Sequence, residues 1–256
     1  MCLLLVLTAC SGKRKEAGRA PVGSSESRER LFVGFLSSLQ GVPYDKAGEK
    51  MREWFDRYEK DTAMTAVVTR YLYDPSSPYR NEELYLPFVH GLALSEYTPD
   101  SLRQAYAYDE RMCSLNRVNT GAADFEFETL GGQRLTLYGI RARYTLLLFS
   151  NPDCTACKDI MDALSANDVI SGAILDGSLA VVNVYIDGDL AAWRRYAVNY
   201  PPSWHSGFDP HGVIRSDVLY NVRAIPSLYL LDEGKKVILK DAPGVEVDYY
   251  LTNALN

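Results

Sequence analysis

Cysteine and histidine are scarce in this sequence, which contains 5 cysteines and 3 histidines in 256 residues. A structural zinc site normally needs four Cys or His ligands. Only one pair of cysteines here is closely spaced, so we expect no metal site. A framework of several disulfides is disfavoured for the same reason.

The lack of excess positive charge and the lack of a long apolar run each exclude a class of function. Asp and Glu outnumber Lys and Arg, 33 to 27, and the net charge of −6 argues against nucleic-acid binding. No apolar run approaches the roughly 20 residues that a helix needs to cross a bilayer. Instead, 47% of the residues are hydrophobic, which supports buried cores, and the length of 256 residues suggests two domains.

The most informative motif is Cys154-Thr155-Ala156-Cys157, because of the segments that flank it. Before it, the uninterrupted apolar run at 144–149 predicts a buried strand. After it, Ile160, Met161 and Leu164 recur at the spacing of an amphipathic helix. We therefore expect both cysteines on the first helical turn, where they can close a small disulfide ring. Half of a metal site and a plain structural disulfide are the alternative interpretations.

The position of the motif also predicts its reactivity. A helix N-terminus presents unpaired N–H groups and the positive end of the helix dipole, and both favour a thiolate over a thiol. Cysteines of such motifs have pKa values of about 3.5–7.5, against about 8.5 for a free cysteine. We expect Cys154, the nearer to the dipole, to be the attacking thiolate and Cys157 to resolve the mixed disulfide.

A second element supports redox chemistry. Ile225-Pro226 directly precedes the strand-like run 227–231, and a proline in that position often marks a turn or a cis peptide bond. Together with the paired cysteines, this pattern resembles that of thioredoxin-fold oxidoreductases, in which a cis-proline loop packs against the CxxC motif. Upstream, the segments 121–127 and 130–137 resemble the opening of the TlpA-like, membrane-anchored periplasmic branch.

The resemblance covers residues 119–256 and implies an α/β thioredoxin-like fold for them. It also implies a thiol–disulfide oxidoreductase that acts through Cys154 and Cys157, with Ile225 and Pro226 holding the substrate chain in an extended pose. No cofactor is implied beyond the redox-active disulfide. The implied partners are periplasmic proteins with disulfides and a membrane electron donor, and this branch is mostly reductive.

The residue before the first cysteine departs from that branch, whose members usually carry an aromatic residue there. Here it is Asp153, an anion that opposes thiolate formation at Cys154, whereas the helix dipole favours it. The sequence leaves open which effect prevails. It also offers no acidic residue that can be assigned as the buried proton acceptor that thioredoxins place under the second cysteine.

Three further segments of the C-terminal half have recognisable patterns. The apolar run at 179–187 predicts another buried parallel strand, and 190–198 predicts a crossover helix. Residues 200–209, with two prolines, are expected to form an insertion near the CxxC end of the sheet. A short helix is expected at 216–220.

The N-terminus predicts a lipid anchor. Leu7-Thr8-Ala9-Cys10 resembles the lipobox of bacterial lipoproteins, so we expect residues 1–9 to be a shortened signal segment and Cys10 to be acylated. Residues 10–25 are rich in Ser, Gly and charged residues, which favours a flexible tether. These features predict a membrane-anchored lipoprotein of the cell envelope that faces the periplasm of a Gram-negative bacterium.

Residues 26–118 predict an all-α domain ahead of the α/β domain. Apolar stripes at helical spacing alternate with Pro- and Gly-containing breakers, which indicates four or five helices in a small bundle. No motif in this domain carries chemistry, and Cys113 is expected to be a buried small hydrophobic residue. A non-catalytic adaptor lipoprotein, with this domain as its docking surface, is therefore the alternative function.

Overall fold

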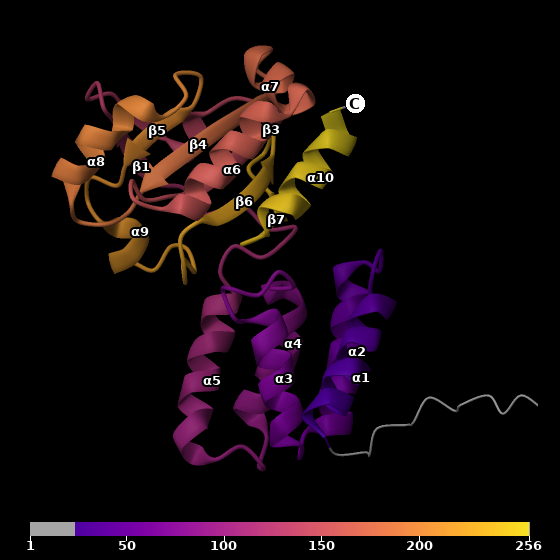
Figure 1. Ribbon diagram of the computed structural model, residues 1–256. Helices are drawn as coiled ribbons and strands as arrows, with labels where there is room; N and C mark the ends of the chain where they lie inside the picture. The colour runs from indigo at the N-terminus through magenta and orange to yellow at the C-terminus, as the bar shows by residue number, and fades with distance from the viewer. Residues whose placement is uncertain (1–23, 256) are drawn as a thin grey trace, which may run out of the picture. The chain divides into compact units, whose positions relative to one another are not determined.

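The computed structural model describes residues 24–255 (Figure 1). The predicted signal segment at 1–9 and the acylation site Cys10 lie outside the described residues. Five helices precede the first strand: α1 (Ser25–Ser38), α2 (Tyr44–Tyr58), α3 (Thr62–Leu72), α4 (Glu82–Leu94) and α5 (Asp100–Cys113). The expectation of a helical N-terminal part with four or five helices is confirmed.

The first helix belongs to a separate structural unit, since the chain divides after residue 40. Within α1, the Ser24 side chain accepts a hydrogen bond from the Ser27 amide and caps the helix N-terminus. Helices α3 and α4 of the second unit begin in the same way. The Asp61 carboxylate caps α3, and the Asn81 side chain caps α4 by accepting from the Leu84 amide.

Helices α2 and α4 approach each other closely where Gly91 faces Phe55. A Cβ atom added at Gly91 would lie 2.5 Å from Cδ1 of the Phe55 ring, inside van der Waals contact. The same ring packs edge-on against Phe88, with ring centroids 5.6 Å apart. Because Gly91 has no side chain, the Phe55 ring can pack between the two helices.

The C-terminal part is built on one mixed sheet of seven strands. The strands are β1 (Glu126–Thr129), β2 (Arg134–Thr136), β3 (Tyr144–Phe149), β4 (Leu179–Tyr185), β5 (His205–Phe208), β6 (Ser227–Asp232) and β7 (Val237–Leu239). Their spatial order is β2-β1-β5-β4-β3-β6-β7. Strands β3, β4 and β5 are parallel, and the other neighbours pair antiparallel.

Helices connect and cover these strands. They are α6 (Thr155–Ala166), α7 (Asp168–Leu175), α8 (Leu190–Tyr196), α9 (Val213–Ser216) and α10 (Gly244–Leu255), with short 3-10 turns at Leu137–Gly139 and Ala197–Asn199. Figure 1 shows α6 and α10 crossing one face of the sheet. Among the described residues, this arrangement confirms the expected α/β thioredoxin-like fold.

The central strand β3 is buried on both faces, which explains its continuous apolar sequence. Leu146 and Leu148 point into a core that includes Met161 of α6 and Leu251 of α10. Alternate residues, among them Leu147, point into a second core on the opposite face. The two cores therefore hold β3 in place, and with it the loop that follows its C-terminal end.

Two expectations for the C-terminal half need correction. Residues 205–208 form strand β5, parallel to β4, within the stretch expected to be an insertion. The short helix lies at 213–216 rather than at 216–220, because the Asp209 carboxylate accepts from the Ile214 amide and fixes the first turn there. The strand at 179–185 and the helix at 190–196 are confirmed.

Backbone hydrogen bonds change partner at the predicted boundary between residues 118 and 119. The Val118 amide donates to the Glu83 carboxylate at the start of α4, at 2.8 Å. The Asn119 amide donates to the Val237 carbonyl oxygen of β7, also at 2.8 Å. The boundary itself stays a prediction. Across residues 24–255, the structure contains no helix with the length and apolar character needed to cross a membrane.

The Gly91–Phe55 contact yields a stability prediction. Gly91→Ala should destabilise the protein by about 1–3 kcal/mol, because the new Cβ forces the Phe55 ring out of a packed position. Gly34→Ala, on the exposed face of α1 with no heavy atom within 4 Å of the added Cβ, should instead be neutral or slightly stabilising. Urea unfolding of both variants measures the difference. Equal stabilities would show that the ring has room to move.

Candidate redox site

The pairing of β3 with β6 creates the site. These strands run antiparallel with Phe149 opposite Ser227, so the end of β3 meets the beginning of β6. Cys154 follows Phe149 by one short turn, and Pro226 immediately precedes Ser227. The strand register thus brings together two motifs that lie about seventy residues apart in the sequence.

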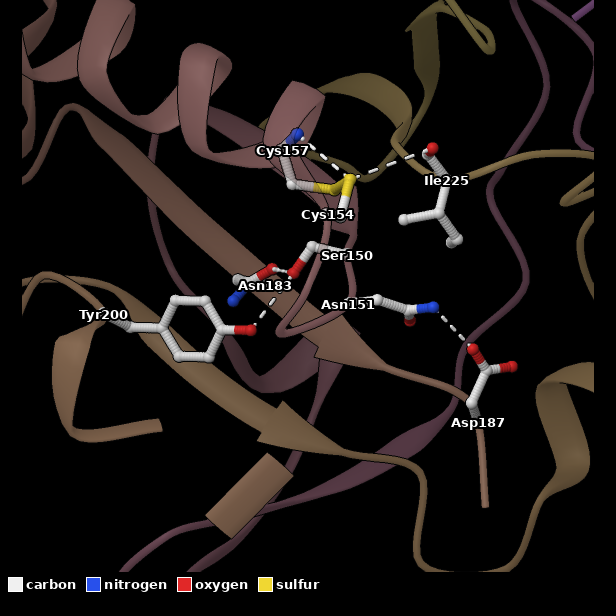
Figure 2. The surroundings of a disulfide bond; sticks show 8 residues. All are labelled: Ser150, Asn151, Cys154, Cys157, Asn183, Asp187, Tyr200 and Ile225. Atoms are coloured by element: carbon white, nitrogen blue, oxygen red, sulfur yellow. Dashed lines mark hydrogen bonds between the residues drawn. A yellow bond between two sulfur atoms is a disulfide. The ribbon is translucent and has the colours of Figure 1, made fainter. Parts of the chain in front are cut away.

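Both features predicted for these motifs are confirmed. Cys154 is the N-cap of α6, and the Ile225–Pro226 peptide bond is cis. The Cys154 sulfur lies 3.9 Å from the Ile225 carbonyl oxygen, a contact drawn as a dashed line in Figure 2. A disulfide sulfur carries no hydrogen, so this contact becomes a hydrogen bond only in the reduced protein, where the thiol can donate.

Cys154 and Cys157 form a disulfide across the first turn of α6, with their Cα atoms 5.2 Å apart. The Cys157 amide donates a hydrogen bond to the Cys154 sulfur at 3.0 Å. Cys157 is buried, with 2% of its surface exposed, whereas Cys154 is half-buried and its neighbours Thr155 and Ala156 are exposed. An incoming disulfide can therefore reach Cys154 and not Cys157.

The carboxylate that departs from the family pattern is solvent-exposed. Asp153 directly precedes the N-cap residue, and its side chain faces water. Water screens its charge, whereas the Cys157 amide contacts the Cys154 sulfur directly. On geometry, the helix N-terminus therefore outweighs Asp153 in setting the charge of the Cys154 sulfur.

Neutral polar side chains gather next to the disulfide in Figure 2. Ser150 donates to the Asn183 amide oxygen at 2.5 Å, and the Tyr200 hydroxyl lies 3.4 Å from the Ser150 hydroxyl. Ser150 and Asn183 are each 1% exposed. Burial raises the pKa of Tyr200, while its hydrogen bonds to Ser150 and Asn183 act in the opposite direction. This trio therefore stays uncharged at neutral pH.

The sequence reasoning missed this trio, although one signal was available. Asn183 is a polar residue inside the apolar strand β4, where its side chain must find a partner. The Leu148–Asn183 strand register places it beside the end of β3, next to Ser150. Tyr200 carried no comparable signal, because its position depends on the path of the chain after α8.

The turn that carries the first cysteine is tied to the end of β4. The Asn151 amide donates to the Asp187 carboxylate at 2.7 Å, and Arg215 pairs with the same carboxylate at 2.6 Å. Asp187 follows β4, and Arg215 lies in α9. The segment between β3 and Cys154 is therefore bonded to the end of β4 and, through Asp187, linked to α9.

The remaining described cysteine is not part of the disulfide. Cys113, at the end of α5, is a free and fully buried thiol, as predicted. Burial raises its pKa, and the nearby Glu82 carboxylate acts in the same direction, so the thiol stays protonated and unreactive. Among residues 24–255, no group of three or more metal-binding side chains occurs.

Comparison with solved structures decides the family. A thioredoxin-like protein from Bacteroides caccae is 33% identical, superposes with a TM-score of 0.84, and is matched over 91% of this chain and 85% of its own. This chain belongs to the thioredoxin-like proteins. The match spans both parts of the molecule, the helices as well as the sheet.

Other comparisons match one part of this thioredoxin-like chain. The C-terminal domain of an uncharacterized protein from Bacteroides fragilis is 40% identical, with a TM-score of 0.52, covering 54% of this chain and 98% of that domain. A conserved protein of unknown function from the same species is 34% identical, with a TM-score of 0.52, over 53% and 98%. Residues 21–111 match the domain of unknown function DUF5106. No curated protein matches the chain.

The exposed position of Asp153 yields a prediction for the thiol. Asp153→Ala should lower the pKa of Cys154 by less than about one unit, because it removes a screened anion near the sulfur. Thiolate absorbance against pH measures the shift. Asp159→Ala, which removes an exposed carboxylate further along α6, should have a smaller effect. A larger shift from Asp159→Ala would contradict the prediction.

Proposed function

We propose that this thioredoxin-like protein is a thiol–disulfide oxidoreductase that reduces disulfides of periplasmic proteins. One observation carries the proposal: the Cys154 sulfur sits at the N-terminus of the 12-residue helix α6 and accepts the Cys157 amide hydrogen bond. That environment favours a thiolate. The accessible thiolate is then next to the half-buried residues Ile225 and Pro226.

In the proposed reaction, the Cys154 thiolate attacks one sulfur of a substrate disulfide. This forms a mixed disulfide and releases the other substrate sulfur as a thiolate, which takes a proton from solvent. Cys157 then attacks the Cys154 sulfur, the bond between Cys154 and the substrate breaks, and the proton of the Cys157 thiol passes to the second substrate sulfur, which leaves as a thiol. The substrate gains two electrons and two protons, and the protein is left with the Cys154–Cys157 disulfide.

The backbone beside Cys154 supplies the substrate site. A substrate chain lying next to Ile225 in an extended pose can pair its backbone with that segment, as strand-adding peptides do. Such pairing would hold the substrate disulfide against the Cys154 sulfur. Ile225 and Pro226 therefore act in substrate binding. The reaction needs no cofactor beyond the dithiol of Cys154 and Cys157.

Turnover needs a source of electrons. We assign this role to a membrane electron donor that reduces the Cys154–Cys157 disulfide after each cycle. The reductive direction is supported by the resemblance of segments 121–127 and 130–137 to the mostly reductive TlpA-like branch. Acylation of Cys10 would keep the protein at the membrane, on the periplasmic side of a Gram-negative envelope, within reach of that donor.

Cysteine substitutions test the catalytic proposal. Cys154→Ser should lower insulin-disulfide reduction by about a thousandfold or more, because it removes the nucleophile. Cys157→Ser should still attack but accumulate the mixed disulfide, detectable as a covalent adduct by mass spectrometry. Cys113→Ala is the control and should leave turnover unchanged. A folded wild-type protein without reductase activity would instead favour the non-catalytic adaptor.

A separate experiment tests the anchor. Cys10→Ser should move the full-length protein from the membrane fraction to the soluble fraction of fractionated cells, because the acylated residue is lost. Cys2→Ser, in the same segment, should leave the protein in the membrane fraction. Retention of Cys10→Ser in the membrane would place the anchor elsewhere in the chain.

A further inference from the structure

A buried cluster of charges joins α4 to the segment that precedes β6. Its members are two carboxylates and three cations: Glu82, Asp241, Arg80, Arg223 and Lys240. Arg223 lies 3.0 Å from Glu82 and 3.2 Å from Asp241. Lys240 lies 2.8 Å from Glu82, and the side chains of both are 1% exposed.

Stability alone is a poor explanation for this cluster. Removing charges from water is expensive, and the attraction between buried ions often only offsets that penalty. The charges are nevertheless tightly coupled. Burial acts to lower the pKa of Arg223, but the carboxylates of Glu82 and Asp241 outweigh it and raise that pKa. The contacts of the cluster therefore indicate a role in fixing a conformation.

The conformation that it fixes is that of residues 221–227. The Asn221 amide donates to the Glu82 carboxylate at 2.6 Å, and Arg223 donates to the same oxygen at 3.0 Å. At the other end of the segment, the Ser227 hydroxyl donates to the Asp241 carboxylate at 2.7 Å. Hydrogen bonds to Glu82 and Asp241 therefore hold the segment on both sides of Ile225.

This segment is the one that faces the redox disulfide. The Ile225 carbonyl oxygen lies 3.9 Å from the Cys154 sulfur, and the contact partners Arg223 and Ser227 are each two residues from Ile225. Glu82 is the first residue of α4 and lies within the region matched by the domain of unknown function. The Glu82 carboxylate of the helical part therefore binds the segment of the sheet domain that lies beside the disulfide.

We propose that Glu82 is a positioning residue for protein substrates, which sets the 221–227 segment at the distance from Cys154 that an extended substrate chain requires. This rests on the proposed reductase function and assigns a role in it to the helical part. The carboxylate acts through Asn221 and Arg223 and touches neither sulfur nor substrate. It is therefore not a catalytic residue.

The proposal predicts different effects on large and small substrates. A protein disulfide binds through backbone pairing along the segment, so a loosened segment should weaken its binding. A small disulfide reaches the Cys154 thiolate without such pairing. The Cys157 amide and the dipole of α6, which activate that thiolate, do not depend on Glu82.

Glu82→Gln tests this, with Glu83→Gln as a matched control. The two carboxylates are adjacent on the first turn of α4 and both are buried, but Glu83 bonds Arg117 and the Val118 amide rather than the 221–227 segment. In Glu82→Gln, KM for insulin reduction should rise about fivefold, the size expected for roughly one lost hydrogen bond. Its kcat, and its kcat/KM for oxidised glutathione, should stay near wild type.

Two results would overturn the proposal: an equal rise in the insulin KM of both variants, or an equal loss on insulin and glutathione disulfide in Glu82→Gln. If Glu82→Gln does not fold, Asn221→Ser replaces it, because it removes one hydrogen bond to Glu82 and keeps all five charges. The same rise in KM is expected, and its absence overturns the proposal. A wild-type protein inactive on both disulfides would instead refute the reductase function itself.

Discussion

The antiparallel register of β3 and β6 is the constraint on which the site depends. With Phe149 opposite Ser227, the turn that leads into Cys154 and the cis peptide that precedes β6 must share one edge of the sheet. The register is firmly set because alternate residues of β3 fill two separate cores, so a slip of one residue would exchange them. Burial of β3 thus fixes the geometry around the disulfide.

The different surroundings of the two sulfur atoms give Cys154 and Cys157 different chemical roles. Cys154 is accessible and receives the Cys157 amide hydrogen bond, whereas Cys157 is buried. The neighbouring trio of Ser150, Asn183 and Tyr200 is neutral, so the charge of the site is set mainly by the helix N-terminus. An exposed Asp153 modifies that charge without reversing it.

The helical part and the sheet part occupy separate stretches of the sequence, but ion pairs between buried side chains connect them. The C-terminal domain of an uncharacterized protein from Bacteroides fragilis, 40% identical over 54% of this chain, crystallised as a separate domain. In the present chain, Glu82 nevertheless reaches Asn221 and Arg223 beside the disulfide. The thioredoxin-like protein from Bacteroides caccae matches both parts, which places the two together in a relative as well.

Local patterns in the sequence determined much of this protein. They predicted the helical first part, the buried strand and amphipathic helix around Cys154, and the cis Pro226, because apolar periodicity and proline geometry act over a few residues. Strand β5 was missed because its four residues are too few to show periodicity. The contacts of Ser150 with Asn183 and of Glu82 with Arg223 were decided by tertiary structure alone. Each joins residues that are brought together only when the sheet and the helices pack.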